Sequence, residues 1–142
     1  MVNKSNKVPS IFTKIINNEI PSYKIYEDDE VLAFLDIYPI QPGHMLVVSK
    51  QQVDPFTNLS KATYGHLMAV CRQLAIHLRS KTKCKRVVLR IDGYDVPHVH
   101  VHLVPSNTPE DTYKPGRMDI APNYKELEKM AKKLTYGENI YG

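Results

Sequence analysis

The feature that most constrains this chain is a short segment in which three histidines alternate with aliphatic residues. Residues 98–104 read His-Val-His-Val-His-Leu-Val, so half of the six histidines in the chain fall within five positions. Successive side chains of a β-strand point to opposite faces of its sheet. The segment therefore predicts a strand with imidazoles on one face and a buried aliphatic row on the other. A sheet face gains little stability from imidazoles, which favours a chemical role over a packing role.

Hydrophobic patterning over the rest of the 142-residue chain predicts helices mixed with short strands. Helical spacing of apolar residues occurs over residues 11–16, 60–78 and 124–134, with Ser10 and Ser60 as caps of the first two. Strand patterns occur over residues 24–26, 31–37, 44–48, 86–91 and 98–104. The short links between strands favour an α+β fold with an antiparallel sheet over a doubly wound one. A long polar loop is expected over residues 105–122 because this stretch is rich in proline.

Composition narrows the classes of protein and partner. The formal net charge is +4 and the pI is near 9.0, which weakly favours anionic partners. The basic run at residues 79–86 lacks aromatic residues, so it favours a solvated helix end over a nucleic-acid groove. Residues 1–10 resemble neither a signal peptide nor a membrane anchor, and we expect a flexible segment there, followed by a single domain over residues 11–142. No apolar run is long enough to cross a bilayer, and a cytoplasmic protein is expected.

The two cysteines and two of the other histidines are interpreted as structural residues. Cys71 and Cys84 are too few for a disulfide scaffold, and we expect one buried thiol and one surface thiol. His66 and His77 fall on the side of the long helix opposite its apolar stripe. We therefore expect both of these imidazoles to face solvent without a functional role.

Two kinds of chemistry fit three imidazoles on one strand face. The first is a metal site, because histidine is a common zinc ligand. However, the Cα atoms of His98 and His102 would lie about 13 Å apart on a regular strand, which is awkward for a single ion. The second is nucleophilic catalysis at phosphorus, in which His100 attacks and its two neighbours stabilise the phosphate oxygens. Imidazole is neutral and nucleophilic near pH 7, so this chemistry needs no metal.

Residues 98–104 match the His-φ-His-φ-His-φ-φ signature of the histidine triad (HIT) family, in which φ is an apolar residue. Residues 11–21 (IFTKIINNEIP), 33–39 (AFLDIYP) and 42–48 (PGHMLVV) are similar to the N-terminal helix and the next two strands of that family. The chain thus resembles the HIT family, Hint-like branch, over roughly residues 11–105. The resemblance implies a homodimer in which two antiparallel sheets with flanking helices join edge to edge.

The resemblance also implies roles for individual residues. His100 is similar to the family's nucleophile, which carries the nucleotide as a covalent intermediate. His98 and His102 match the supporting histidines, and His44 matches a fourth histidine on a neighbouring strand. Asp36 matches the acidic residue that binds the ribose hydroxyls. Four apolar residues match the walls around the base, although core packing explains them equally well: Phe12, Ile15, Phe34 and Ile37.

Two departures from the family pattern affect the expectations. Many members carry Cys-Ile-Phe-Cys near the N-terminus, where the thiols help to hold a structural zinc. This chain has Ser10-Ile11-Phe12-Thr13, and hydroxyls are poor zinc ligands, so no metal and no other cofactor is expected. Just before the triad, residues 93–97 replace a stretch that assists the leaving group in the family. Asp95 lies there, and it can protonate a leaving group only if its pKa is raised.

The expected activity is hydrolysis at the α-phosphorus of a purine nucleotide (an AMP or GMP derivative). A nucleoside phosphoramidate or an aminoacyl-AMP is the favoured substrate class, and neither nucleic acid nor a membrane is an expected partner. Three alternatives stay open. They are a dinucleoside polyphosphate (Ap4A-like) hydrolase that uses the same His100, a metal-binding domain built on the three histidines, and a nucleotide-binding module without turnover.

Overall fold

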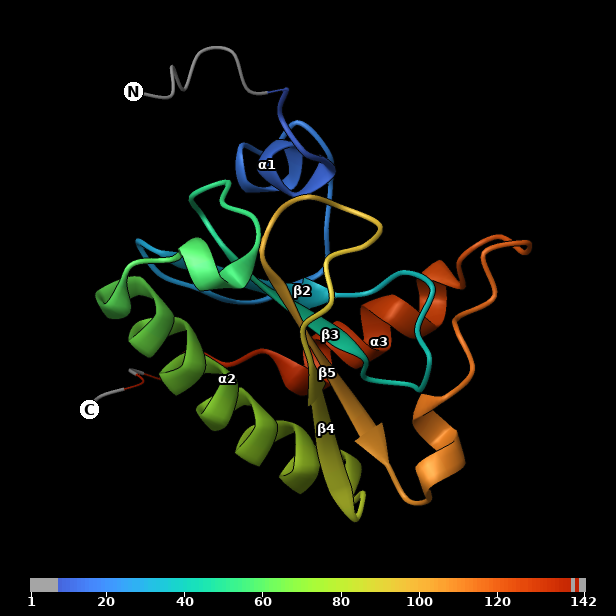
Figure 1. Ribbon diagram of the computed structural model, residues 1–142. Coiled ribbons are helices and arrows are strands. Elements are labelled where there is room, and N and C mark those ends of the chain that lie inside the picture. Colours follow the sequence, from blue (N-terminus) through green and yellow to red (C-terminus); the bar gives the residue numbers. More distant parts are fainter. Residues whose placement is uncertain (1–7, 139, 141–142) are drawn as a thin grey trace.

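The computed structural model describes residues 8–138 and 140, and it contains a five-stranded sheet (Figure 1). The strands run in the order β1-β2-β3-β5-β4, and all four neighbouring pairs are antiparallel. Their bounds are β1 (Lys24–Glu27), β2 (Val31–Leu35), β3 (Met45–Ser49), β4 (Arg86–Arg90) and β5 (His100–Ser106). The expected antiparallel α+β fold is confirmed.

Within residues 8–138, three α-helices accompany the sheet: α1 (Ile11–Ile16), α2 (Lys61–Thr82) and α3 (Tyr124–Leu134). The hydroxyls of Ser10 and Ser60 accept hydrogen bonds from the backbone N–H groups three residues later, which confirms both predicted caps. Short 3-10 turns lie in the connections, and those within the described part of the chain include η2 (Phe56–Asn58) and η3 (Pro109–Thr112). Among the described residues, no helix has both the length and the apolar character needed to cross a membrane.

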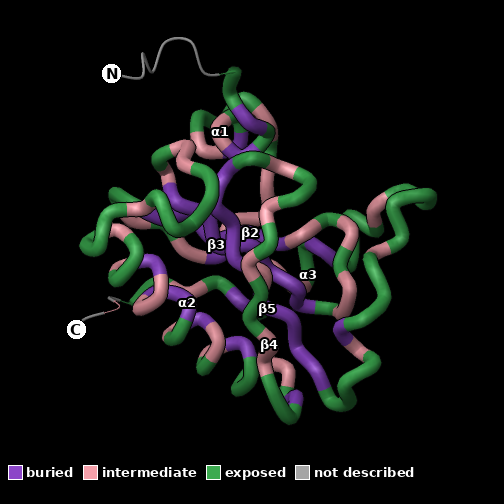
Figure 2. Tube along the Cα trace, in the orientation of Figure 1, coloured by how far each residue is buried: buried purple, intermediate pink, exposed green. Residues whose placement is uncertain are grey.

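The sheet separates two hydrophobic clusters, because alternate residues of each central strand point to opposite faces. The larger cluster joins β2, β3 and β5 to α2 and α3, and it includes Val31, Val47 and Val101. The smaller cluster lies beneath α1, which Figure 1 shows at the end of the molecule away from most of α2. Its buried members are Phe12, Ile15, Leu32, Phe34, Leu46 and Val48. Figure 2 shows buried chain concentrated in the central strands between these layers.

The end of the sheet departs from the predicted boundaries at β5. The strand begins at His100, two residues later than expected, because the His98 N–H bonds to the Val96 carbonyl and the Val99 N–H to the Val53 carbonyl. At its other end β5 continues to Ser106, and η3 follows within the stretch expected to be a loop. The other strand bounds differ from prediction by at most two residues.

Expectations for two helical histidines and one cysteine were wrong. His66 is half-buried, with its Nε2 2.6 Å from Asp28 Oδ2, and His77 Nε2 lies 2.8 Å from the Leu134 carbonyl oxygen. The β1–β2 turn and the end of α3 lie over this side of α2, which periodicity within the helix cannot reveal. Cys84 is buried like Cys71, so neither is a surface thiol. Burial raises the pKa of the Cys71 thiol to about 12.

Candidate active site

Three imidazoles gather where β5 begins, on the side of the sheet that faces α1. His100 and His102 pair with Val48 and Leu46 of β3, both of which belong to the smaller cluster. The intervening aliphatic residues lie in the larger core on the other face, as the alternation predicts. The ring of Phe12, from α1, meets His98 edge-on with ring centroids 5.7 Å apart and His100 at 4.8 Å.

His98 is fully buried and held at both ring nitrogens. Its Nε2 lies 2.6 Å from the Ser49 carbonyl oxygen, and its Nδ1 lies 2.6 Å from Ser10 Oγ. A carbonyl oxygen only accepts hydrogen bonds, so Nε2 carries the proton. Nδ1 of the neutral ring then accepts from the Ser10 hydroxyl. The bonds therefore define one tautomer of His98.

His100 is oriented by the backbone of His98. Its Nδ1 lies 2.6 Å from the His98 carbonyl oxygen, so Nδ1–H donates and Nε2 keeps its lone pair. The residue is buried, with 4% of its surface exposed. A neutral imidazole with one fixed donor nitrogen has its other nitrogen ready as a nucleophile or base.

A second histidine pair stands beside His100. The Ile40 N–H donates to His44 Nδ1 at 3.1 Å, so His44 Nε2 bears the proton and donates to His102 Nδ1 at 3.0 Å. In neutral His102 the remaining donor is Nε2–H. The rings of His100 and His102 meet edge-on with centroids 5.1 Å apart. A hydrogen-bond donor thus adjoins the nucleophilic ring.

The same pair is held neutral over a wide range of pH. Burial is the largest cause that lowers the pKa of His44 to about 3 and that of His102 to about 4. The positive charge of Arg90 lowers both pKa values further. At neutral pH both imidazoles are therefore uncharged, in agreement with the directed hydrogen bonds from Ile40 through His44.

Asp36 lies just after β2 and faces His44. Its Oδ1 accepts from the Tyr38 N–H at 2.8 Å, and its Oδ2 lies 3.7 Å from His44 Nε2. Burial raises the pKa of the carboxyl group, and the bond from Tyr38 partly offsets this. A cavity of about 160 Å³ opens beside Asp36 and His44 and is closed by residues of α3.

The four predicted wall residues do not lie together. Phe12, Ile15 and Phe34 are buried in the smaller cluster, where the first also contacts the triad. Ile37 is 38% exposed and lines the cavity beside Asp36. The structure therefore groups three of the apolar residues in the smaller cluster, one of which, Phe12, contacts the triad, and it places the fourth on the carboxylate's side.

Three charged residues act on His102, and two of them, Arg90 and Asp92, were not predicted from the sequence. Arg90 of β4 pairs in register with His102, and its Nε lies 3.3 Å from Asp92 Oδ2. The negative charges of Asp92 and Asp95 act to raise the pKa of His102 against the lowering effects. Asp95 is thus near the triad, but exposed. Arg90 is the last residue of the edge strand β4, a position that becomes informative only once β4 is known to lie beside β5.

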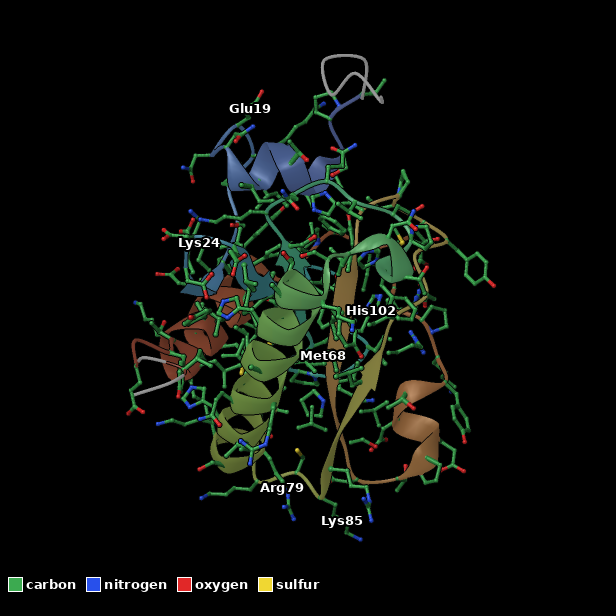
Figure 3. All side chains as sticks on the ribbon, turned by 60° about the vertical axis from the view of Figure 1, so that its left-hand side comes forward. Glu19, Lys24, Met68, Arg79, Lys85 and His102 are labelled. Atoms are coloured by element: carbon green, nitrogen blue, oxygen red, sulfur yellow. The ribbon has the colours of Figure 1, made fainter. Side chains whose placement is uncertain are left out.

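The basic run at residues 79–86 does not contribute to this site. Figure 3 shows Arg79 and Lys85 together at the end of the molecule opposite Glu19, with His102 well above them. Its cations therefore sit at a helix end, as expected, where they complement the helix dipole.

Comparisons with known proteins agree with this geometry. The model of the HIT domain matches residues 17–108. The chain belongs to the HIT family. Adenylylsulfatase HINT1 of Arabidopsis thaliana is 41% identical over 105 residues, which cover 68% of this chain and 70% of that protein.

Solved structures of HIT proteins share the fold. A HIT-like protein from Bartonella henselae superposes with a TM-score of 0.77 at 29% identity, over 94% of this chain and 98% of that one. A zinc-bound histidine triad family protein from Mycobacterium smegmatis gives a TM-score of 0.74 at 27% identity, over 88% of this chain and 89% of its own.

The residues at the N-terminal end of this HIT domain do not fit a structural zinc. Beside His98 stand the hydroxyls of Ser10 and Thr13 and the amide of Gln52, none of which is a good zinc ligand. These groups bond to one another instead: Thr13 Oγ1 donates to Gln52 Oε1 at 2.7 Å. The site is built as a hydrogen-bond network.

In the part of the chain that the structure describes, two other groups of side chains have spacing that suits a cation. Their ligand atoms lie within 4.8 Å of one another, and the groups are Asp36 with His44 and His102, and Asp92 with His100 and His102. His98 belongs to neither group. Of the histidine set proposed for the metal-binding alternative, only His100 and His102 come together in this way.

Proposed function

We propose that this HIT protein hydrolyses purine nucleotide derivatives at the α-phosphorus, with His100 as the nucleophile. The observation that carries the proposal is the bond from His100 Nδ1–H to the His98 carbonyl, which leaves Nε2 as a lone pair beside a second donor imidazole. The favoured substrates are nucleoside phosphoramidates and aminoacyl-AMP, as expected for the Hint-like branch. The name of the Arabidopsis relative, an adenylylsulfatase, supports a nucleotide hydrolase.

The reaction has two displacements at phosphorus. His100 Nε2 forms a bond to the α-phosphorus as the bond to the leaving group breaks. A leaving amine takes up a proton from solvent, and the water that attacks in the second step returns one proton to solvent. His102 Nε2–H donates to a phosphate oxygen and stabilises the charge that develops there. Water then attacks the nucleotidyl-histidine, releases the monophosphate and returns the electron pair to Nε2. Two in-line steps retain configuration at phosphorus.

The rest of the proposed site holds the nucleotide. Asp36, with Oδ1 fixed by the Tyr38 N–H, would accept hydrogen bonds from the ribose hydroxyls through Oδ2. Phe12, beside the triad, and Ile37, beside Asp36, would contact the base, and Ile15 and Phe34 would support Phe12 from within the smaller cluster. His98 and His44 act through the orientation of His100 and His102, and Asp95 is a candidate contact for the leaving group.

The test is replacement of the nucleophile. His100→Ala should abolish hydrolysis of an adenosine phosphoramidate while AMP binds with nearly unchanged affinity, because the ring is needed for chemistry rather than for binding. Wild-type protein mixed with labelled substrate and quenched at high pH should carry labelled AMP on histidine. Hydrolysis that persists in His100→Ala would refute the assignment of the nucleophile. AMP binding with neither turnover nor adduct in the wild type would favour the binding module.

A dinucleoside polyphosphate hydrolase is the second candidate, because Arg90 places a cation beside His102. In that case Arg90→Gln should raise the KM for diadenosine polyphosphate roughly tenfold, since a charge-assisted contact is lost. The KM for a phosphoramidate with an uncharged leaving group should change less than about threefold. Arg72→Gln, which removes the same charge from the exposed side of α2, is the control. Equal effects of Arg90→Gln on both substrates would remove the support for this candidate.

The metal-binding alternative is decided by elemental analysis of the purified protein. A stoichiometric ion required for activity would favour it, and full activity of a chelator-treated sample would exclude it.

A further inference from the structure

We propose that Ser10 is a positioning residue for the nucleophile: its hydroxyl fixes the ring of His98, whose carbonyl in turn fixes the tautomer of His100. The inference rests on the proposed function of His100. A chain of hydrogen bonds thus runs from the start of α1 to the nucleophile.

The first step of the chain is the cap of α1. Ser10 Oγ accepts from the Thr13 N–H at 3.1 Å, so its lone pair serves the helix while its proton is available elsewhere. Two acceptors compete for that proton: His98 Nδ1 at 2.6 Å and Thr13 Oγ1 at 3.3 Å. The shorter contact is to His98, and Nδ1 must accept because Nε2 already donates to the Ser49 carbonyl.

The second step passes through a single residue. The ring of His98 is locked from two sides by Ser10 and by Ser49 of β3, and the residue is 0% exposed. Its carbonyl oxygen lies 2.6 Å from His100 Nδ1. Displacement of the His98 ring therefore moves the backbone group that keeps the proton on Nδ1 of His100.

A third set of contacts keeps Ser10 in place. Gln52 Oε1 accepts from the Ser10 N–H at 2.8 Å and from Thr13 Oγ1 at 2.7 Å, while Gln52 Nε2 donates to the Val8 carbonyl at 2.8 Å. The Gln52 side chain therefore connects Ser10 and the residues before and after it to the segment that follows β3. It also holds α1, and with it the Phe12 ring that packs on His100.

The protein contains a second serine cap that serves as a matched control for the test. Ser60 caps α2 with the same Ser-x-x-Thr arrangement, accepting from the Thr63 N–H at 3.1 Å with its Oγ 3.0 Å from Thr63 Oγ1, but its hydroxyl contacts no histidine. Ser10→Gly and Ser60→Gly each remove a capping hydroxyl, and glycine is tolerated at this position, so both variants should fold.

The kinetic outcome separates positioning from capping. Ser10→Gly should lower kcat for phosphoramidate hydrolysis by roughly 10- to 100-fold, with less than about a threefold change in KM, because small misplacement of a reacting group is costly. Ser60→Gly should leave both constants unchanged. Ser10→Thr keeps a hydroxyl donor and should restore most of the lost kcat.

The second readout needs no substrate and thus tests the inference separately from the proposed function. Long-range ¹⁵N–¹H spectra of the full chain should show the Nδ1–H tautomer for His100 and the Nε2–H tautomer for His98. In Ser10→Gly the His100 signals should move toward a mixture of tautomers, whereas Ser60→Gly should match the wild type. An unchanged His100 tautomer in Ser10→Gly, or equal losses of kcat in both glycine variants, would overturn the proposal. If His100→Ala stayed active, the proposed function of His100 would fail. The spectra would then decide on their own whether Ser10 positions the His100 ring.

Discussion

At the scale of single residues, the site depends on backbone groups that choose the tautomer of each imidazole. The His98 carbonyl directs His100, and the Ile40 N–H directs His44 and through it His102. A backbone carbonyl cannot donate and a backbone N–H cannot accept, so each ring has a defined donor end and acceptor end. The chemistry then needs no charged histidine in the resting protein.

Stability should fall as the solution becomes acidic. The pKa values of His44 and His102 in the folded protein are lowered to about 3 and about 4, so between those values and about 6.5 the unfolded chain binds more protons. The stabilisation is therefore complete above about pH 6.5 and is lost as the pH falls toward 4. Urea unfolding should give a free energy of unfolding that is lower at pH 4.5 than at pH 7 by several kcal/mol. Each unit by which the pKa differs between the folded and the unfolded chain corresponds to roughly 1.4 kcal/mol.

A variant at His44 distinguishes the effect of this histidine pair on stability from the effects of other titrating groups. His44→Gln removes one of the two shifted imidazoles, so the free energy of unfolding should depend less steeply on pH between 4.5 and 7. An equally steep profile in the variant would show that His44 does not contribute.

At the scale of elements, the loop between β2 and β3 carries both Asp36 and His44 and depends on one glycine. Gly43 has φ of +95°, and a Cβ there would lie 3.2 Å from Leu78 Cδ1 and 3.3 Å from Pro105 Cγ. A side chain at this position is strained by the backbone and crowded by α2 and β5. Close packing of Gly43 against α2 and β5 thus fixes the backbone next to His44.

Two glycine substitutions with opposite expected signs test this point. Gly43→Ala should lower the free energy of unfolding by about 1–3 kcal/mol and reduce turnover, because it displaces His44. Gly65→Ala, in the exposed part of α2 with nothing within 4 Å of the new Cβ, should raise it by about 1 kcal/mol. Both values come from urea unfolding at pH 7. A stabilising Gly43→Ala would mean that the loop adapts without strain.

Sequence patterns predict these elements well because the causes are local. Alternating residues define β5, and a serine followed by helical spacing defines the start of α1 and α2. The bond between Ser10 and His98 spans 88 positions, and Arg90 reaches His102 only through strand pairing. Likewise His66 and His77 are covered by segments distant in the chain. Such contacts depend on tertiary packing, which periodicity does not encode.

At the scale of the whole molecule, the two edges of the sheet differ. Beyond β1, the Tyr136 N–H that follows α3 bonds to the Ile25 carbonyl, so the chain itself covers that edge. Beyond β4, no other strand among the described residues pairs with the sheet, and Leu89 is 41% exposed. An uncovered edge strand with apolar side chains is a surface that readily pairs with another strand.

The β4 edge is therefore the proposed site of the homodimer that the HIT resemblance implies. A hollow of about 840 Å³ between α2 and β4 is lined by Ile76, Val87 and Val88, and Ile76 is 52% exposed. Leu89 pairs with Leu103 of the larger core, so its side chain lies on the α2 side of the sheet together with this hollow. Pairing of two β4 strands would cover both apolar surfaces at once.

Sedimentation of the full chain at micromolar concentration should give twice the 16.3 kDa mass of one chain. Leu89→Glu and Ile76→Glu each place a charge in the proposed contact and should shift the protein toward monomer, because an unpaired buried charge is costly. Tyr124→Glu, a change at a residue of similar exposure (57%) at the start of α3, should leave the dimer intact. A wild-type protein that sediments as a monomer, or a dimer that survives both β4-side changes, would contradict association through this edge, since in either case β4 would not be the strand that the partner covers.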